Sequence, residues 1–327
     1  MAGQRVRPAL SAVMRNWPNQ EWRGTFRLSL RLRYLMHGST NENYARAVLF
    51  MLFAAVLLPL LNASIKHLVT IYPVAELLWA RYAGHLAFML LVFAPRYGRS
   101  LLASSRPGLQ LSRSLLFCGS TFLMFYALGF VPLATAAAIS FTAPLIVTAA
   151  SPFLLGEKVG LARGVAVTVG FLGALLVVRP GSGALHWAAF LIFGSATASA
   201  CVQLLSRKLA GYDSPETSNT YMVLAGFLLA TIPLPFIWQP PQGLWHALLF
   251  VMLGVLGGLG HYYLVRAFEL APASFVSPFN YAQILGAALL SIIVFGQVPD
   301  LWTWVGAAII AASGLFILLR EQTGRRR

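Results

Sequence analysis

Long apolar runs constrain the fold of this chain more than any other feature of its sequence. Of its 327 residues, 58% are hydrophobic and only 10% are charged, and the mean hydropathy is +0.72. Water-soluble domains carry about 25% charged residues, so a soluble fold is excluded. The runs lack the alternating pattern of barrel strands, and every backbone amide in lipid must be bonded internally. The sequence therefore predicts an all-α polytopic membrane protein.

Ten apolar runs follow one another along the chain. They are residues 47–66, 74–94, 111–130, 133–155, 159–178, 184–206, 218–238, 244–266, 272–295 and 301–320. A bilayer core of about 30 Å needs about 20 residues of helix, so each run is long enough to cross once. We therefore expect ten transmembrane helices.

The second half of the chain repeats the first. Matching positions 140 residues apart are Pro132 and Pro272, Phe141 and Tyr281, Gly156 and Gly296, and Glu157 and Gln297. Earlier in the repeat the offset is 142, and it pairs Ala54, Lys66 and Pro73 with Ala196, Lys208 and Pro215. Each repeat holds five spans, an odd number, so the two halves must enter the membrane in opposite directions. This inverted arrangement is typical of secondary transporters, with repeats at 47–180 and 181–320.

The basic residues predict the orientation. If the amino terminus is cytoplasmic, 21 of the 24 lysines and arginines fall on the cytoplasmic side or in the flanking segments. Only Lys66 and Arg179 lie outside, and Arg81 lies within the second span. By the positive-inside rule, both termini are cytoplasmic and the protein lies in the cytoplasmic (inner) membrane. The net charge of +15 is explained by this distribution, and no nucleic-acid partner is expected.

Basic segments flank the two repeats. Residues 1–46 form an arginine-rich amino-terminal segment that we expect to be disordered, and residues 321–327 form a basic cytoplasmic tail. Two alternatives for the first segment stay open: an arm that binds anionic lipid, or an upstream extension of a protein whose working start is Met36.

Ionisable residues within the second span are candidates for function. A charge at the centre of a membrane helix costs about 2.5 to 3.5 kcal/mol. Arg81 and His85 are four residues apart and share one helix face, with Glu76 nearer the outer surface. We expect Glu76 and Arg81 to form a structural charge clamp, and we place His85 on the substrate pathway.

Polar side chains in later spans add further candidates. Ser195, Ser199 and Gln203 follow one another at four-residue spacing on the sixth span, as a single polar stripe. The stripe predicts either cavity lining or packing between helices. Asn280 and Gln283 share one face of the ninth span and need partners at mid-membrane; for these we favour a pathway role.

The eighth span has the most unusual composition. Its glycines lead into His261 and Tyr262, which could line an aromatic substrate chamber or pack tightly between helices. The corresponding first-half positions supply the remaining pathway candidates from this comparison, namely Thr121, Tyr126 and, matching Asn280, Ser140.

The motifs within the repeats resemble a known family. Ala134, Pro144 and Gly156-Glu157 are similar to the pattern of the EamA-type branch of the drug/metabolite transporter superfamily. The resemblance covers about residues 47–320 and implies two five-helix repeats that carry small metabolites. It also implies a framework arginine at Arg81 and a cavity lined by the first, third, fourth, sixth, eighth and ninth helices, which adds Asn62 to the pathway. The second repeat departs from the pattern at Gln297 and lacks a proline matching Pro144.

No enzyme signature accompanies these features. Histidines never pair at helical spacing and no phosphate-binding loop occurs, so we expect neither metal nor cofactor. The sequence predicts a secondary carrier that moves an amino acid, vitamin or drug-like solute by alternating access, with export favoured over import. A lipid or lipid-linked sugar flippase, and then an intramembrane enzyme, are the alternatives. Proton coupling through His85 or His261, and a monomeric or homodimeric state, are left open.

Overall fold

The computed structural model describes residues 40–155, 160–179, 187–209, 212–271, 276 and 279–325. The chain divides into two units, Met1–Arg46 and Ala47–Arg327, and the second unit holds the helices described here apart from the first turns of α3. The predicted disorder of residues 1–39 and the motif Gly156-Glu157 lie outside the described residues.

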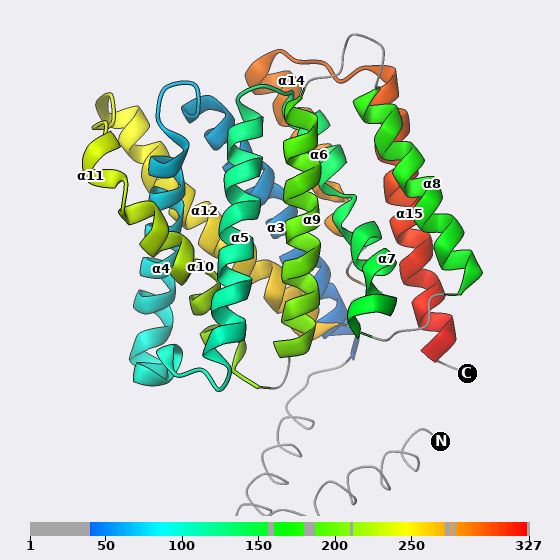
Figure 1. The fold of residues 1–327 in the computed structure, drawn as a ribbon, viewed down its shortest axis with the longest axis horizontal. Helices are drawn as coiled ribbons and strands as arrows, with labels where there is room; N and C mark the ends of the chain where they lie inside the picture. The colour runs from blue at the N-terminus through cyan, green and yellow to red at the C-terminus, as the bar shows by residue number, and fades with distance from the viewer. Residues whose placement is uncertain are drawn as a thin grey trace, which may run out of the picture. The chain divides into compact units, whose positions relative to one another are not determined.

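The described part of the chain is helical and contains no strand (Figure 1). Its elements are α3 (Thr40–Leu68), α4 (Val74–Tyr97), η2 (Gly98–Leu102), α5 (Pro107–Leu128), α6 (Leu133–Ser140), α7 (Ala143–Leu155), α8 (Leu161–Val178), α9 (Ala188–Leu209), α10 (Pro215–Thr231), α11 (Leu234–Ile237), α12 (Gly243–Leu270), α14 (Ala282–Phe295) and α15 (Leu301–Arg325). Seven described segments are long and apolar enough to cross a membrane, and Ala282–Phe295 and Leu301–Ile317 are shorter apolar helices. The prediction of an all-helical membrane protein is confirmed, whereas ten crossings in inverted repeats stay a prediction.

The fourth predicted span is broken into two helices. The sequence predicted one helix over 133–155, but α6 ends at Ser140 and α7 begins at Ala143. Pro144 has no N–H to bond the carbonyl four residues earlier, which explains the break. In the second repeat α14 begins only at Ala282, after Tyr281. Tyr281 corresponds to Phe141, and the two rings contact each other with centroids 5.0 Å apart.

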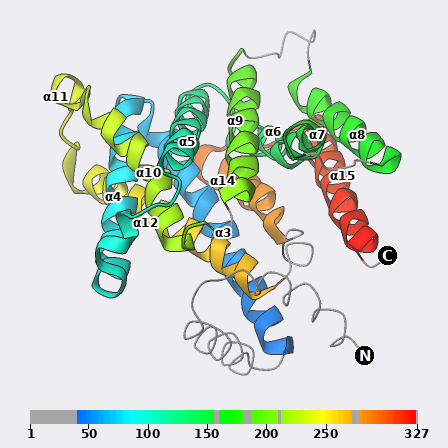
Figure 2. The ribbon, with the colours of Figure 1, turned by 60° about the horizontal axis from the view of Figure 1, so that its bottom comes forward.

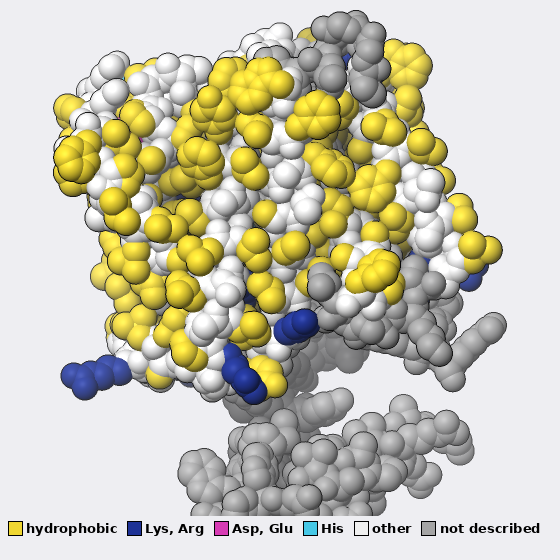
Figure 3. Space-filling view, in the orientation of Figure 1, with side chains coloured by type: hydrophobic (Ala, Val, Ile, Leu, Met, Phe, Trp, Pro, Cys, Tyr) yellow, Lys and Arg dark blue, Asp and Glu magenta, His cyan; other side chains and the backbone are white. Residues whose placement is uncertain are grey.

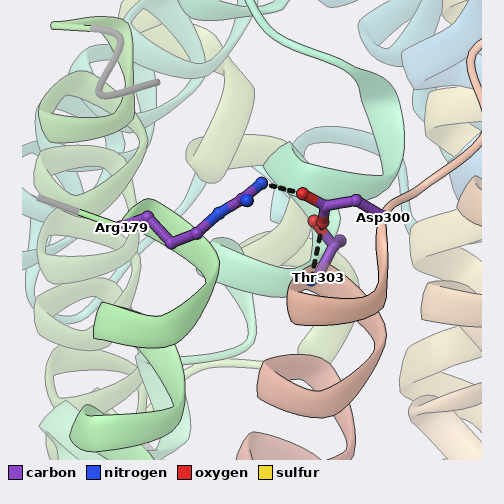
Figure 4. A network of polar contacts seen from close by, with 3 residues as sticks. All are labelled: Arg179, Asp300 and Thr303. Atoms are coloured by element: carbon purple, nitrogen blue, oxygen red, sulfur yellow. Dashed lines mark hydrogen bonds and ion pairs between the residues drawn. The ribbon is translucent and has the colours of Figure 1, made fainter. Parts of the chain in front are cut away.

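The last helices of the two repeats, α8 and α15, lie side by side in both ribbon views (Figures 1 and 2). Small residues allow the approach: a Cβ on Gly173 would lie 3.0 Å from the Gly306 carbonyl oxygen. Arg179, at the end of α8, forms an ion pair with Asp300, just before α15 (Figure 4). Asp300 also accepts a hydrogen bond from the Thr303 N–H at 2.8 Å and so caps α15. Because the end of one helix meets the start of the other, α8 and α15 are antiparallel.

Corresponding helix pairs also pack in corresponding ways. In α5, the Ser120 hydroxyl lies 2.7 Å from the Ser199 hydroxyl of α9. Positions 120 and 199 correspond to Gly260 in α12 and Leu57 in α3, at offsets of 140 and 142. A Cβ on Gly260 would lie 3.6 Å from the Leu57 Cβ, so α12 packs on α3 where α5 packs on α9.

The surface of the helices is apolar, as a lipid-facing surface requires. Figure 3 shows hydrophobic side chains over most of the visible face, with lysine and arginine side chains near its lower edge. The tryptophans of the described residues lie near helix ends that the sequence analysis assigns to the outer side: Trp79, Trp187, Trp238, Trp245, Trp302 and Trp304. Tryptophan is enriched at the membrane–water interface, so these rings mark one boundary of the membrane-embedded region.

A polar junction joins the α4–α5 connection to the loop before α10. Asp213 accepts hydrogen bonds from the Ser104 hydroxyl (2.6 Å), the Ser105 N–H (2.7 Å) and the Gln110 amide (2.8 Å). Burial alone would raise the pKa of Asp213, but these hydrogen bonds outweigh it and lower the pKa to about 2. The junction thus favours the ionised carboxylate.

Replacing Asp213 with asparagine should make the stability of the protein less dependent on acid pH. A carboxyl group whose pKa is lowered on folding stabilises the fold above its unfolded pKa, and this contribution is lost as pH falls through the folded value. We expect Asp213→Asn to melt below the wild type at pH 7 and the gap to close between about pH 4 and pH 2. Thermal unfolding in detergent across this range measures it, and a gap that stays constant with pH would contradict the assignment.

Candidate functional site

Three ionisable side chains, Arg81, His85 and His261, meet between α4 and α12. We call them the central polar cluster. The Arg81 Nη2 atom lies 3.2 Å from the His261 Nε2 atom, and the rings of His85 and His261 stack with centroids 6.1 Å apart. The Arg81 guanidinium also lies over the rings of Phe117 and Phe125 of α5, at 5.5 and 5.3 Å. Residues from three helices and both repeats therefore converge on one cation.

In the central polar cluster Arg81 and His85 are buried and His261 is half-buried, and the cluster is incompletely hydrogen-bonded. His85 is 0% exposed and Arg81 6%. Within the part of the chain that the structure describes, both ring nitrogens of His85 and the Nε atom of Arg81 have no hydrogen-bond partner. A buried polar group without a partner costs about 1 to 3 kcal/mol, and more when it is charged. Such groups are rare in folded proteins and need an explanation, which a bound solute would provide.

The predicted clamp between Glu76 and Arg81 takes a different form in the structure. Glu76 accepts a hydrogen bond from the Gln239 N–H at 3.2 Å, and Arg81 binds His261. The two residues form no ion pair with each other. Each side chain instead bonds to the second repeat. Glu76 bonds to the segment before α12, and Arg81 bonds to α12 itself. Among the described residues, Arg81 has no carboxylate to balance its charge.

Glycines bring α12 close to α4 at this point. A Cβ added to Gly84 of α4 would lie 2.5 Å from the Gly254 Cα atom of α12, so the two backbones touch. One turn further along α12, a Cβ on Gly257 would lie 3.4 Å from the Arg81 Nε atom. From the sequence, the glycines of the eighth span favour close helix approach or bending, but the sequence does not indicate α4, or Gly84 within it, as the partner. It also missed Phe117 and Phe125, which resemble the many other phenylalanines of apolar helices.

Several predicted pathway residues satisfy their polar groups within or between helices. The Thr121 hydroxyl donates to the Phe117 carbonyl, and the Ser140 hydroxyl donates to the Ala136 carbonyl, both at 2.8 Å. Ser199 bonds to Ser120. Of the two readings of the sixth-span stripe, packing between helices therefore accounts for Ser199.

Two predicted residues lie on exposed surface. Tyr126 is 40% exposed and stacks on Phe122, with Trp187 6.0 Å away between ring centroids. This aromatic column joins the end of α5 to the start of α9, away from the central polar cluster. Gln203 is also exposed and forms no hydrogen bond with a described residue.

The remaining candidates are half-buried. The Gln283 amide donates to the Asn280 side-chain oxygen, so these two residues partly satisfy each other. Tyr262 packs on Phe88 and Phe93 of α4, at 6.2 and 5.8 Å between ring centroids. Asn62 forms no hydrogen bond with a described residue. His261 is thus the one predicted second-repeat residue that the structure brings to Arg81 and His85.

Comparison with known proteins identifies the family. The EamA-like transporter family matches this chain twice, over residues 45–179 and again over residues 186–319. The chain belongs to the EamA-like transporter family. The EamA assignment confirms the resemblance drawn from the sequence, and it identifies the chain as a multi-pass membrane transporter.

Relatives of this EamA protein are named as transporters of small molecules. A riboflavin transporter of Vibrio cholerae is 36% identical over 70% of this chain and 77% of its own length. A riboflavin transporter of Rhizobium johnstonii is 30% identical over 85% and 93%, and an S-adenosylmethionine uptake transporter of Rickettsia felis is 28% identical over 74% and 82%. These names indicate small-molecule transport rather than catalysis.

A solved structure shares the fold. One crystal structure, 20% identical in sequence, superposes with a TM-score of 0.60 over 85% of this chain and 98% of its own. At this identity the likeness concerns the fold alone.

Proposed function

We propose that this EamA protein is a secondary carrier that moves a small organic metabolite by alternating access and binds it at the central polar cluster. One observation carries the proposal: Arg81 is a buried cation without a carboxylate partner among the described residues, beside a histidine whose ring nitrogens are both unbonded. A solute that presents carboxylate or carbonyl oxygens would supply the missing hydrogen bonds and charge. The aromatic rings around Arg81 would pack on the apolar part of that solute.

Packing between the repeats supports the inverted ten-span arrangement that alternating access requires. The corresponding helices α8 and α15 are antiparallel, as the ion pair of Arg179 with Asp300 requires. The contact of Ser120 with Ser199 has its counterpart in the packing of Gly260 on Leu57. Two halves with equivalent contacts of this kind can exchange their conformations and so open to opposite sides.

The substrate class follows from the same chemistry and from the relatives. Riboflavin presents carbonyl oxygens on a flat ring, and S-adenosylmethionine carries a carboxylate and a purine. Both are compatible with a guanidinium donor between aromatic rings and imidazoles. We propose a solute of this kind: a ring system with an acceptor edge, by which we mean carbonyl or carboxylate oxygens that accept hydrogen bonds from Arg81. Cations without such an edge should be excluded by the charge of Arg81.

Flux measurements in proteoliposomes test the function. Riboflavin, S-adenosylmethionine, amino acids and a quaternary amine would be measured in both directions, with and without a pH gradient. We expect saturable flux for a solute with an acceptor edge and none for the quaternary amine. Efflux faster than uptake would support the predicted preference for export, and dependence on the pH gradient would indicate proton coupling. The absence of flux for every solute, together with lipid scrambling, would favour the flippase.

Replacing Gln283 with alanine should lower flux by about fivefold. The amide donates to Asn280 and lies half-buried at the start of α14, and the loss of one hydrogen bond to a solute or its neighbours costs about 1 kcal/mol. Flux at equal expression measures the effect. Gln297→Ala is the matched control, since its side chain is exposed and, among the described residues, only its backbone N–H is bonded, to the Ser291 carbonyl. Equal flux in the two variants would remove Gln283 from the pathway.

A further inference from the structure

Two lysines at corresponding positions of the repeats have different environments. Lys66 lies near the end of α3 and Lys208 near the end of α9, at the offset of 142 that relates these helices. Lys66 is 8% exposed, whereas Lys208 is exposed. A difference at corresponding positions indicates where one conformation breaks the symmetry between the repeats.

Lys66 joins α3 to the end of α5. Its ammonium group donates to the carbonyl oxygens of Leu128 at 3.1 Å and Val131 at 2.7 Å. Carbonyls at a helix end lack partners within the helix and carry the negative end of the helix dipole. The ammonium also lies 5.4 Å from the ring centroid of Phe295, at the end of α14. Lys66 thus contacts the ends of α5 and α14, which belong to different repeats.

The carbonyls that correspond to Leu128 and Val131 belong to Phe268 and Ala271, at the end of α12. The two helix ends share one hydrogen bond: the Val131 N–H bonds to the Ala127 carbonyl, and the Ala271 N–H bonds to the Ala267 carbonyl. They differ in length, since α5 ends at Leu128 and α12 continues to Leu270. The second repeat therefore has helix-end carbonyls at the corresponding positions. Lys208 nevertheless forms no hydrogen bond with a described residue.

We propose that Lys66 and Lys208 form alternating latches of the transport cycle. In the conformation of this structure, Lys66 binds the end of α5 and holds the outer side closed. In the opposite conformation, Lys66 leaves these carbonyls, and Lys208 binds the Phe268 and Ala271 carbonyls to close the cytoplasmic side. The inference rests on the inverted-repeat carrier proposed above and adds the residues that select its two states.

Distances between spin labels in the substrate-free, reconstituted protein test the latches. The two native cysteines, Cys118 and Cys201, would be replaced with serine, and cysteines for labelling introduced at exposed positions. An outer pair at Thr70 and Phe130 and a cytoplasmic pair at Tyr212 and Phe268 report on the two sides.

Removal of the first latch should shift the populations. In Lys66→Met we expect the outer distance to lengthen and the cytoplasmic distance to shorten, with at least about a tenfold change in the ratio of the two states, or about 1.4 kcal/mol. Adding Lys208→Met should reverse the shift, because the second latch is then lost as well. Lys66→Arg keeps the charge and should keep most of the wild-type distribution, and Arg99→Met, at an exposed basic position, should leave it unchanged.

The two possible roles of Lys66 give different results. If it only stabilises the fold, Lys66→Met lowers the melting temperature with unchanged distances, and Lys208→Met has no effect in that background. Either result would overturn the proposal. Because the distances are measured without solute, failure to find a transported substrate leaves this test intact.

Discussion

Replacing Gly84 with alanine should destabilise the protein by about 3 kcal/mol, the upper end of the range for overpacked interiors. A Cβ at this position would lie 2.5 Å from the Gly254 Cα atom, and backbone atoms cannot rotate away as the end of a side chain can. The helices α4 and α12 would have to separate, and the same separation would pull His261 away from Arg81. We expect a lower apparent melting temperature in detergent together with loss of flux.

Gly119→Ala is the matched control for this prediction. Gly119 also lies within a helix, α5, but a Cβ there would meet nothing within 4 Å. Alanine favours helix over glycine by about 1 kcal/mol, so this variant should melt at or above the wild-type temperature. If both alanine variants melt alike, the close approach of α4 and α12 does not hold the fold together.

Replacing Arg81 with methionine should reduce flux by about 100-fold or more while leaving the fold intact. Hydrogen bonds to a charged group contribute about 1.5 to 3 kcal/mol each, and a solute with an acceptor edge would lose at least one of them and its charge partner. The substrate-free protein, however, would be relieved of a buried cation whose Nε atom has no partner among the described residues. Replacing a whole buried ion pair with apolar residues is often neutral for stability, and among the described residues Arg81 has no carboxylate partner that Arg81→Met would leave unpaired.

Melting temperature and flux together separate the two roles of Arg81. A binding role predicts that Arg81→Met melts close to the wild type and that Arg81→Lys, which keeps the charge, recovers part of the flux. A purely structural role predicts the reverse order, with loss of stability first and with flux falling only as folded protein is lost. A methionine variant that is stable and fully active would remove Arg81 from the binding site.

The sequence alone indicates the class of fold, and it singles out Arg81, His85 and His261, which the structure brings together. The length of the apolar runs identifies the membrane helices. Because an ionisable group in lipid is costly, Arg81 and His85 are functional candidates whatever direction their side chains take. What it could not supply is the partner of each polar group. Arg81 was paired with Glu76 because the two are neighbours in one helix, whereas the structure pairs it with His261, 180 residues away.

The polar stripe of the sixth span shows the same limit. The spacing places Ser195, Ser199 and Gln203 on one face, but Ser195 is buried and Gln203 exposed, and Ser199 meets a serine of another helix, Ser120, which is 79 positions earlier. A hydroxyl that needs a partner has the same sequence pattern whether that partner is a helix or a solute. The break at Tyr281 is harder to predict for a related reason, since the position that corresponds to Pro144 is Ile284.

The contact between Phe141 and Tyr281 has a consequence for how the halves can move. In the inverted-repeat carrier that we propose, a residue that touches its own counterpart lies near the axis that relates the repeats, because that axis maps such a contact onto itself. When two halves rock against each other about this axis, the points on it are displaced least. The two rings therefore lie where the halves move least relative to each other. A covalent cross-link between them should leave the rocking motion free, whereas a cross-link at the outer or the cytoplasmic side of the carrier would stop it.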